Sequence, residues 1–402
     1  MSEAVLDPPA FPMPRSCPLS PPPEYARLRA RCPVSKVVLP DGRTTWVITS
    51  YALAREFLAD SRASKDTTRP GYPSPAPGFR AATQGLARGF VFQDPPEHTR
   101  HRRMVADEFA VKRVQGMRAY VQEVVDEHVN ALMAGDRPTD LVRELALPVP
   151  SLVICELLGV PYDDREFFHT RTAAAVSRSS SPEERTSVLG ELRHYLSELV
   201  DRKEREPADD LISRLIGKYR RSGDYDRERI VVTATMLLVA GHETTANMIA
   251  LGTVALLENP DRLAELESDP AIMPKAIEEL LRYFSIADVG TARVATADIA
   301  LGEVVVREGD GVIALGAAAN HDPAAFDHPG ELDFHRSGTP HMAFGYGIHQ
   351  CLGQNLARLE LEVVFTTLFS RIPGLRLAVP ARELPFKGEA NIYGIHEVPV
   401  TW

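Results

Sequence analysis

Apolar residues recur at intervals of three and four positions through most of the chain between residues 97 and 281. Residues 120–133 show this spacing clearly, because their apolar side chains fall on one face of an α-helix, and residues 191–205 repeat it. A further short helix is predicted to begin near Glu24. The pattern therefore predicts a fold dominated by helix.

Apolar and polar residues alternate instead in a few short segments. Residues 36–39 and 44–49 alternate around Pro40-Asp-Gly-Arg43, and Asp-Gly accepts the positive φ of a tight turn, so a β-hairpin is predicted. Shorter strand-like stretches return late in the chain, at residues 304–306, 312–315, 375–379 and 398–401.

Two segments rich in proline lack either pattern. Residues 1–23 are expected to form an irregular arm, because proline lacks a backbone donor and restricts φ. Residues 68–90 are long for a connection, so we expect them to cover a functional site. Because no flexible linker divides the sequence, residues 1–402 are predicted to form one domain, mainly α with small β-sheets (an α+β fold).

Composition and charge restrict the possible partners. The 402 residues are 44% hydrophobic, and 55 acidic against 45 basic residues give a net charge of -10, which argues against a nucleic-acid partner. The sequence shows no signal-peptide pattern, and no apolar run approaches the ~18 residues of a membrane span. We therefore expect a soluble, cytoplasmic monomer that does not contact a membrane.

The four cysteines show no C-x-x-C pair and no zinc-ligand spacing, so neither a disulfide framework nor a structural zinc is predicted for Cys17, Cys32, Cys155 and Cys351. Cys351 differs from the others because it lies in a glycine-rich segment directly before an amphipathic helix. The dipole and free N–H groups at a helix start favour a thiolate over a thiol.

The glycines around Cys351 are typical of a backbone that lies flat against a broad, planar group, because Gly345, Gly347 and Gly353 have no Cβ to intrude. A thiolate against a flat surface indicates a proximal ligand of haem iron. A buried, inert cysteine beside a glycine turn is the alternative interpretation.

The segment from Phe344 to Gly353 resembles the haem-binding signature of the cytochrome P-450 family, Phe-Gly-x-Gly-x-His-x-Cys-x-Gly, at every fixed position. The resemblance runs from about residue 11 to residue 402, and it is closest to the soluble bacterial class that hydroxylates specialised metabolites and foreign compounds. It implies that family's single-domain fold and haem b (iron protoporphyrin IX) with Cys351 as the axial thiolate. It also implies haem-binding roles for Phe344, Gly345 and Gly353, and a hydrogen bond from His349 to a haem propionate.

A second candidate segment lies within a predicted long, buried helix, where a mid-helix Gly241 costs ~1 kcal/mol relative to Ala and needs a reason. Thr244 can bond the carbonyl of Ala240, four residues earlier, and locally open the helix into a groove for dioxygen and water. Glu243 adds an acid, and an acid with an alcohol forms a proton relay. The family pattern at this point, Ala/Gly-Gly-x-Asp/Glu-Thr, agrees.

The residues of this helix leave two other interpretations open. His242 and Glu243 begin like the zinc motif H-E-x-x-H, but Ala246 replaces the second histidine and argues strongly against zinc. The other interpretation is a core helix that carries a few polar residues.

Glu279 and Arg282 are three residues apart on a predicted helix, a spacing that is usually a solvated ion pair worth ~0.3 kcal/mol. Within the resemblance they match the Glu-x-x-Arg element, which forms a buried network with a third group. Arg336 is the first candidate for that group, and His341 is the second.

Basic residues follow two prolines at the start of another predicted helix. His98 and Arg102 lie one turn apart, and a solvated basic face is the alternative interpretation of them. By the resemblance they contact the haem propionates, with Arg293 as a third contact. Arg100 and Arg103 point elsewhere and are expected to remain available to an acidic redox partner.

The resemblance and these residues together predict a monooxygenase that inserts one atom of O2 into a substrate and reduces the other to water, with Glu243 and Thr244 as the proton relay. No dinucleotide fingerprint or flavin domain is evident, so electrons are expected from a ferredoxin and an NAD(P)H-dependent ferredoxin reductase. The alternatives are a peroxide-driven peroxygenase, against which the acid and alcohol argue, and a non-catalytic haem or gas-binding protein.

By the same resemblance, the substrate pocket is lined by residues 68–90 and 167–181 and by Val239, Val289 and Ile392. These positions are mostly apolar or small, with a few arginines at 80, 88 and 171. We therefore expect a medium to large hydrophobic molecule with a few polar groups, which would be hydroxylated or epoxidised.

Overall fold

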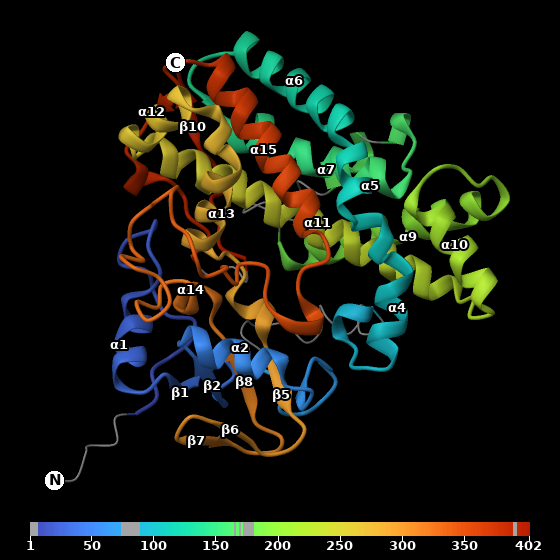
Figure 1. The fold of residues 1–402 in the computed structure, drawn as a ribbon. Helices are drawn as coiled ribbons and strands as arrows, with labels where there is room; N and C mark the ends of the chain where they lie inside the picture. Colours follow the sequence, from blue (N-terminus) through green and yellow to red (C-terminus); the bar gives the residue numbers. More distant parts are fainter. Residues whose placement is uncertain (1–6, 74–88, 165, 169, 172–180, 389–391) are drawn as a thin grey trace.

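The computed structural model describes residues 7–73, 89–164, 166–168, 170–171, 181–388 and 392–402. The fold is mainly α with small sheets, as predicted (Figure 1). The helices of the described residues include α1 (Pro23–Arg31), α2 (Tyr51–Ala59), α4 (Glu97–Ala106), α5 (Val111–Gly116), α6 (Arg118–Ala134), α7 (Pro148–Leu158), α9 (Pro182–Arg205), α10 (Leu211–Ser222), α11 (Arg227–Leu257), α12 (Pro260–Ser268), α13 (Met273–Phe284), α14 (Gly316–Ala319) and α15 (Gln354–Arg371). The strands include β1 (Val34–Val38), β2 (Thr44–Ile48), β3 (Ala63–Ser64), β4 (Thr139–Asp140), β5 (Arg293–Ala295), β6 (Ile299–Leu301), β7 (Val304–Val306), β8 (Gly311–Ala314), β9 (Arg376–Leu377) and β10 (Pro399–Thr401).

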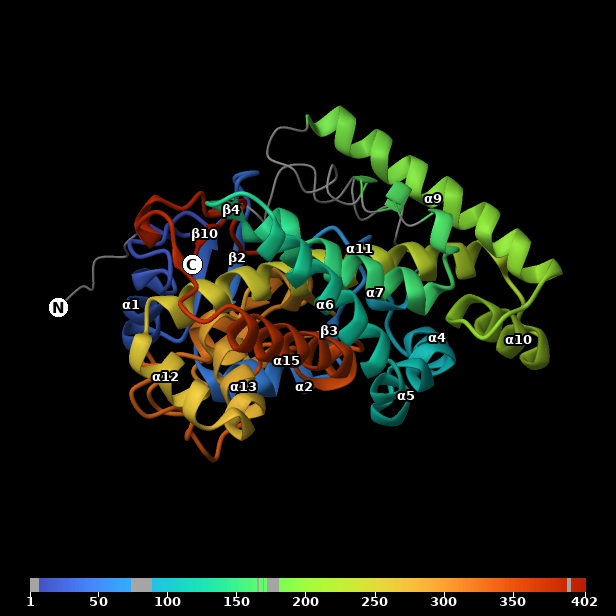
Figure 2. The same cartoon turned by 90° about the horizontal axis from the view of Figure 1, so that it is seen from above.

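The 31-residue helix α11 crosses the middle of the molecule, and α7, α9 and α15 pack against it (Figures 1 and 2). The side chain of Asp226 caps its first turn by accepting a hydrogen bond from the Arg229 N–H at 3.1 Å. Residues 230–238 and 245–256 are fully buried, as expected for a helix that is apolar on all sides. Although α11 is long, neither it nor any other described helix has the length and apolar character needed to cross a membrane.

The largest sheet has five strands in the order β1-β2-β8-β5-β3. β1 and β2 form the predicted hairpin, whose turn contains Gly42 at a φ of 80°. β8, predicted as residues 312–315, pairs in parallel with β2, so Val312 lies opposite Trp46. Strands β3 to β6 have two or three residues each, which is too short for an alternating pattern, and they were not predicted. The strand predicted at residues 375–379 is shorter in the structure, where only β9 (Arg376–Leu377) is observed.

The N-terminal arm is irregular in residues 7–22, as predicted, but it is anchored to the sheet. Ala10 pairs with Val38, and the Phe11 N–H donates to the Val38 carbonyl at 2.8 Å. Phe11 and Met13 are buried in the apolar core beside the sheet. Most of the expected covering segment, at 74–88, lies outside the described residues.

Candidate functional site

The glycine-rich segment around Cys351 forms a loop that its own backbone closes. The Cys351 N–H donates to the Phe344 carbonyl at 2.8 Å, and the Gly345 N–H donates to the Met342 carbonyl at 2.9 Å. Helix α15 begins at Gln354, as predicted, so the loop holds the cysteine just before a helix N-terminus.

The glycines of this loop have two different roles. Gly345 and Gly347 have φ angles of 71° and 75°, which favour glycine. A Cβ at Gly347 would lie 2.4 Å from the carbonyl oxygen of Leu58 in α2, so this glycine allows the loop to approach α2 rather than a planar group. A Cβ at Gly345 or Gly353 would meet nothing within 4 Å, and for these two the flat-surface interpretation stays a prediction.

Protein atoms surround the Cys351 thiol closely, although the residue keeps an exposed surface. This burial raises the pKa of the thiol, which is the opposite of the shift predicted from the helix start. The N–H groups of Gly353 and Gln354 and the charges of Arg102 and Arg358 lower the pKa of Cys351, but burial outweighs them. In the protein alone, burial therefore opposes the thiolate form, which a bound metal ion would favour.

Basic side chains from separate segments meet beside this loop, and we call Lys65, His98, Arg102, Arg293 and His349 the basic cluster. The rings of His98 and His349 are 4.2 Å apart between centroids. Burial, reinforced by neighbouring positive charges, lowers the pKa of His98 to about 4 and that of His349 to about 2. Burial also lowers the pKa of Arg293 in β5 to about 10. The structure thus gathers basic side chains in a poorly solvated place, where burial disfavours the charged form of both histidines.

Several groups of the basic cluster have few partners. Among the described residues, neither ring nitrogen of the buried His98 has a hydrogen-bond partner. The Arg293 guanidinium donates to the Ala292 carbonyl at 2.8 Å, and Arg102 donates to the Gln350 carbonyl at 2.5 Å. Buried polar and charged groups are normally paired. The basic cluster therefore fits a ligand that carries carboxylates, and haem carries two.

Lys65 is a member of the basic cluster that the sequence did not predict. Its side chain is buried and donates to the carbonyls of Gly290 at 2.7 Å and Ala292 at 3.3 Å. Burial lowers its pKa, and the charge of Arg293 lowers it further. A lone lysine carries no motif, and it reaches the cluster because β3 pairs with β5, which places Ser64 opposite Val294.

The middle of α11 carries the predicted acid and alcohol. The Thr244 hydroxyl donates to the Ala240 carbonyl at 2.8 Å, as predicted. The helix remains α-helical here, so the expected local opening is not observed. Residues 239–241 and 243–244 are nevertheless accessible between two buried stretches, with Ala240 exposed. Glu243 and Thr244 therefore lie where the central helix reaches accessible space.

The neighbours of this pair have packing roles. A Cβ at Gly241 would lie 3.3 Å from the Ile154 side chain of α7, which explains the glycine by close helix packing. His242 is buried, and its Nδ1 lies 2.8 Å from the Leu238 carbonyl oxygen. No group of three or more His, Cys, Asp or Glu in the described part of the chain could hold a metal ion, so the zinc interpretation has no support.

One contact of the proposed relay was not predicted. The ammonium of Lys387 lies 3.2 Å from Glu243 Oε1, although the two residues are far apart in sequence. No local pattern signals such a contact, because it depends on how the C-terminal segment packs against α11.

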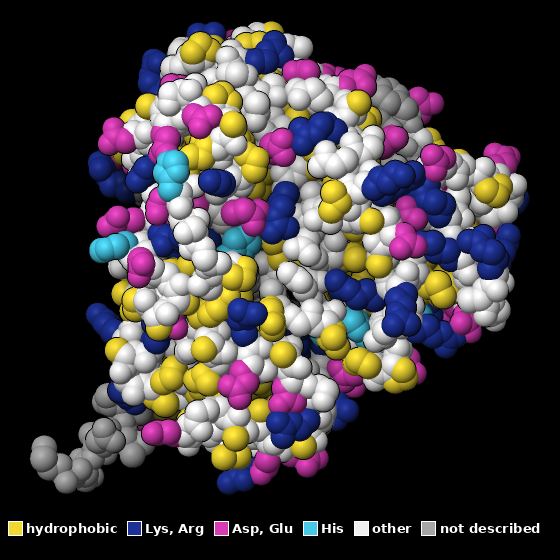
Figure 3. Space-filling model, in the orientation of Figure 1, with side chains coloured by type: hydrophobic (Ala, Val, Ile, Leu, Met, Phe, Trp, Pro, Cys, Tyr) yellow, Lys and Arg dark blue, Asp and Glu magenta, His cyan; other side chains and the backbone are white. Residues whose placement is uncertain are grey.

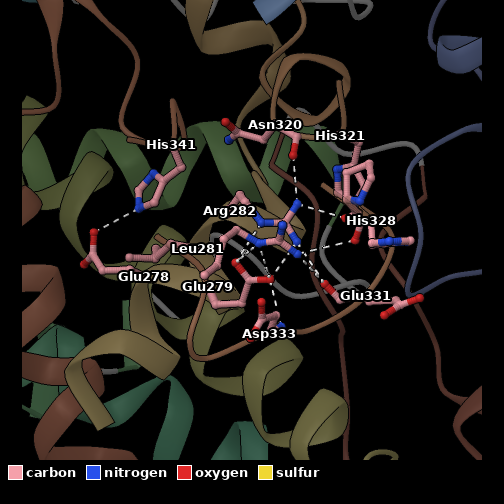
Figure 4. Close-up of polar contacts among 12 residues, drawn as sticks. Glu278, Glu279, Leu281, Arg282, Asn320, His321, His328, Glu331, Asp333 and His341 are labelled. Atoms are coloured by element: carbon pink, nitrogen blue, oxygen red, sulfur yellow. Dashed lines mark hydrogen bonds and ion pairs between the residues drawn. The ribbon is translucent and has the colours of Figure 1, made fainter. Parts of the chain in front are cut away.

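Glu279 and Arg282 of α13 form the buried centre of a polar network (Figure 4). The Arg282 guanidinium donates to both carboxylate oxygens of Glu279 at 2.8 Å and to the carbonyls of Asn320 at 2.8 Å and Glu331 at 3.1 Å. Arg336 donates to both Glu279 oxygens at 3.1 Å. Of the two candidates for the third group, Arg336 is therefore the correct one.

His341 belongs to a neighbouring network, because its Nε2 lies 3.1 Å from Glu278 Oε2. Figure 4 shows the two side chains facing one another. Arg358 of α15 donates to the two oxygens of Glu278 at 2.6 and 2.9 Å. Although burial raises the pKa of Glu278, these hydrogen bonds hold it at about 2. The Arg358 guanidinium also lies 4.6 Å from the centroid of the Phe344 ring. This network ties the Cys351 loop to α13 and α15.

Figure 3 shows Lys and Arg side chains gathered over the face on which α4 and α5 lie. Arg100 is paired with Asp224 but its side chain remains 50% exposed, so its availability to a redox partner stays a prediction. Arg103 of α4 and Lys112 of α5 are exposed, and neither forms an ion pair with another described residue.

The residues predicted to line a substrate pocket lie partly outside the described residues, at 74–88, which include Arg80 and Arg88, and at 172–180. Val239, Val289 and Ile392 are all half-buried. Arg171 pairs with Glu191 at 3.0 Å, and its guanidinium lies 4.7 Å from the centroid of the Phe167 ring.

Comparison with known proteins finds similarity along nearly the whole chain. A family model described as Cytochrome P450 matches residues 271–373. Pentalenic acid synthase of Streptomyces avermitilis is 48% identical, over 99% of this chain and 98% of that protein. Vitamin D3 dihydroxylase of Streptomyces griseolus is 45% identical, over 99% and 98%. The crystal structure of cytochrome P450 MoxA from Nonomuraea recticatena has a TM-score of 0.94 and 49% identity, over 98% of each chain.

Proposed function

This chain belongs to the cytochrome P450 family, whose members are monooxygenases that bind haem b through a cysteine thiolate, and we propose that Cys351 is that thiolate. The observation that carries the proposal is the basic cluster beside the Cys351 loop, because its poorly paired groups suit the two haem carboxylates. We assign His98, Arg102, Arg293 and His349 to those carboxylates. The loop that would lie along the haem includes Phe344, Gly345 and Gly353.

When bound, haem activates dioxygen, and the thiolate donates electron density that favours cleavage of the O–O bond. The chain itself must deliver protons to the dioxygen site. Glu243 lies in the accessible stretch of α11, where a carboxylate can take a proton from solvent. The Thr244 hydroxyl donates to Ala240, which leaves its oxygen free to accept a hydrogen bond. We assign these two residues to the proton relay.

We propose that the substrate is a medium to large hydrophobic molecule, which is hydroxylated or epoxidised. Half-buried Val239, Val289 and Ile392 would supply apolar contacts. Two relatives are named for pentalenic acid and vitamin D3. A panel of terpenoids, sterol-like molecules, macrolides and drugs, scored by the haem spin-state shift, would identify the substrate class. Shifts produced only by small polar compounds would contradict this proposal.

We further propose that electrons come from a ferredoxin and its NAD(P)H-dependent reductase. Exposed basic side chains on α4 and α5 would offset the overall negative charge for an acidic partner. The decisive experiment compares turnover of an identified substrate with ferredoxin, reductase and NAD(P)H against turnover with hydrogen peroxide alone. Efficient product formation with the electron-transfer proteins supports the proposal, whereas efficient turnover only with peroxide would identify a peroxygenase.

Replacing Arg103 by Glu should slow reduction by ferredoxin several-fold, because it puts a negative charge where the basic face should meet an acidic partner. The effect should be largest at low salt, where screening is weakest. Stopped-flow reduction rates measure it. Arg31→Glu, the same charge change at an exposed position on α1, is the matched control. Equal rates for the two variants at every salt concentration would place the docking face elsewhere.

Replacing Arg293 by Met should speed haem dissociation by roughly 10- to 100-fold, because it removes a charge-assisted hydrogen bond to a carboxylate. The stability of the haem-free protein should be unchanged or higher, because a poorly paired buried charge disappears. Haem transfer to a scavenger protein and thermal unfolding of the haem-free protein measure the two effects. If the haem-free variant were less stable than the haem-free wild type, and haem dissociated from both proteins at the same rate, Arg293 would have only a structural role.

A further inference from the structure

The ammonium of Lys387 contacts α11 at two residues one turn apart. It lies 3.2 Å from Glu243 Oε1 and 2.9 Å from Asn247 Oδ1. The Lys387 side chain is only 6% exposed, whereas that of Glu243 is 28% exposed. The carboxylate therefore faces a buried cation while part of it remains accessible.

The C-terminal segment is folded so that Lys387 reaches this position. The Lys387 N–H donates to the Gly394 carbonyl at 2.8 Å, and Phe386 pairs with Ile395 in a short antiparallel bridge. A Cβ at Gly394 would lie 2.1 Å from Asn247 Oδ1, so the segment approaches α11 as closely as its backbone allows. Several backbone contacts of this segment thus fix the position of Lys387 relative to α11.

A buried lysine loses side-chain entropy and hydration, so its contacts must offset both. Lys387 makes charge-assisted hydrogen bonds to Glu243 and Asn247, which are stronger than hydrogen bonds between neutral groups. It also limits the rotamers that Glu243 can adopt. Both effects act on the residue that precedes Thr244.

We propose that Lys387 is a positioning residue of the proton relay: it holds the Glu243 carboxylate in one orientation in the accessible stretch of α11. This inference rests on the proposed function. An ionised carboxylate can take a proton from solvent and release it toward Thr244, after which it returns to the same contact with Lys387. In this role Lys387 acts on the relay only through Glu243.

The test compares Lys387→Met with the wild-type enzyme, loaded with haem and supplied with ferredoxin, reductase and an identified substrate. The spectrum of the reduced carbon-monoxide complex and the substrate dissociation constant should stay close to wild type. Product per NAD(P)H should fall roughly 3- to 10-fold, with a matching rise in hydrogen peroxide. Lys203→Met, which removes a second lysine that is 14% exposed and paired at 2.7 Å with Asp210, is the matched control and should stay coupled.

A double-mutant cycle separates positioning from a merely structural role. If Lys387 acts through Glu243, the double variant with Glu243→Gln should be no less coupled than Glu243→Gln alone. Additive losses would overturn the proposal, as would unchanged coupling in Lys387→Met. If wild type itself lacked the thiolate spectrum, the proposed function would fail instead, so the two failures are distinguishable.

A second variant, Lys387→Gln, keeps the proposal testable if Lys387→Met does not fold, because Gln keeps a polar side chain at this position but carries no charge. It should show a similar fall in product per NAD(P)H. Coupling equal to that of wild type in this variant would overturn the proposal.

Discussion

Replacing Cys351 by His is expected to abolish oxygen insertion while the fold and much of the haem binding survive. The basic cluster does not include Cys351, so the haem carboxylates keep their proposed partners. An imidazole can bind iron, but it does not donate electron density as a thiolate does, and the O–O bond is then not cleaved productively. Product formation with ferredoxin and reductase should therefore fall by at least on the order of 100-fold.

The control for this experiment is Cys17→His, which changes an exposed cysteine of the N-terminal arm. It should bind haem and form product as wild type does. Wild-type rates in Cys351→His would show that the axial ligand is another residue.

Replacing Thr244 by Ala should uncouple the reaction. The change removes the hydroxyl beside Glu243 but hardly alters apolar packing, so haem binding and substrate affinity should be nearly unchanged. NAD(P)H consumption should continue, while product per NAD(P)H falls by roughly tenfold and hydrogen peroxide rises, because protons no longer arrive in order. Added peroxide should restore part of the product, since it bypasses the damaged proton delivery.

Thr253→Ala is a matched control, because Thr253 makes the same hydrogen bond, to the Ile249 carbonyl at 2.8 Å, in a fully buried part of α11. It should cost stability and leave coupling intact. Measuring NAD(P)H, product and hydrogen peroxide in one reaction distinguishes a relay role of Thr244 from a packing role. If Thr244→Ala instead lost stability or substrate affinity and stayed coupled, Thr244 would be a packing residue.

Local sequence predicted the elements whose signal is local. Turn residues and hydrophobic periodicity are local signals, and they predict three elements correctly: the hairpin around Gly42, the long helix with Thr244 and the helix after Cys351. The order of the five-stranded sheet could not be predicted, because β3 and β5 are too short to carry a pattern and pair only through the tertiary fold.

The same limit applies to the candidate site. Lys65 and Lys387 lack motifs, and each reaches the site through contacts with distant segments. The sequence predicts that Gly347 faces a planar ligand, whereas the structure shows that it approaches α2. A glycine indicates that something lies close to the backbone, but the sequence alone does not show which neighbour it is. The Cys351 pKa was predicted from the helix start alone, whereas burial, which depends on packing, determines its direction.

The most direct test of the account is the absorption spectrum of the reduced, haem-loaded wild-type protein with carbon monoxide. A Soret band at the position of thiolate-ligated haem, lost in Cys351→His, is the result that the account predicts. A band at the position of histidine-ligated haem in wild type, or a thiolate band that persists in Cys351→His, would contradict it.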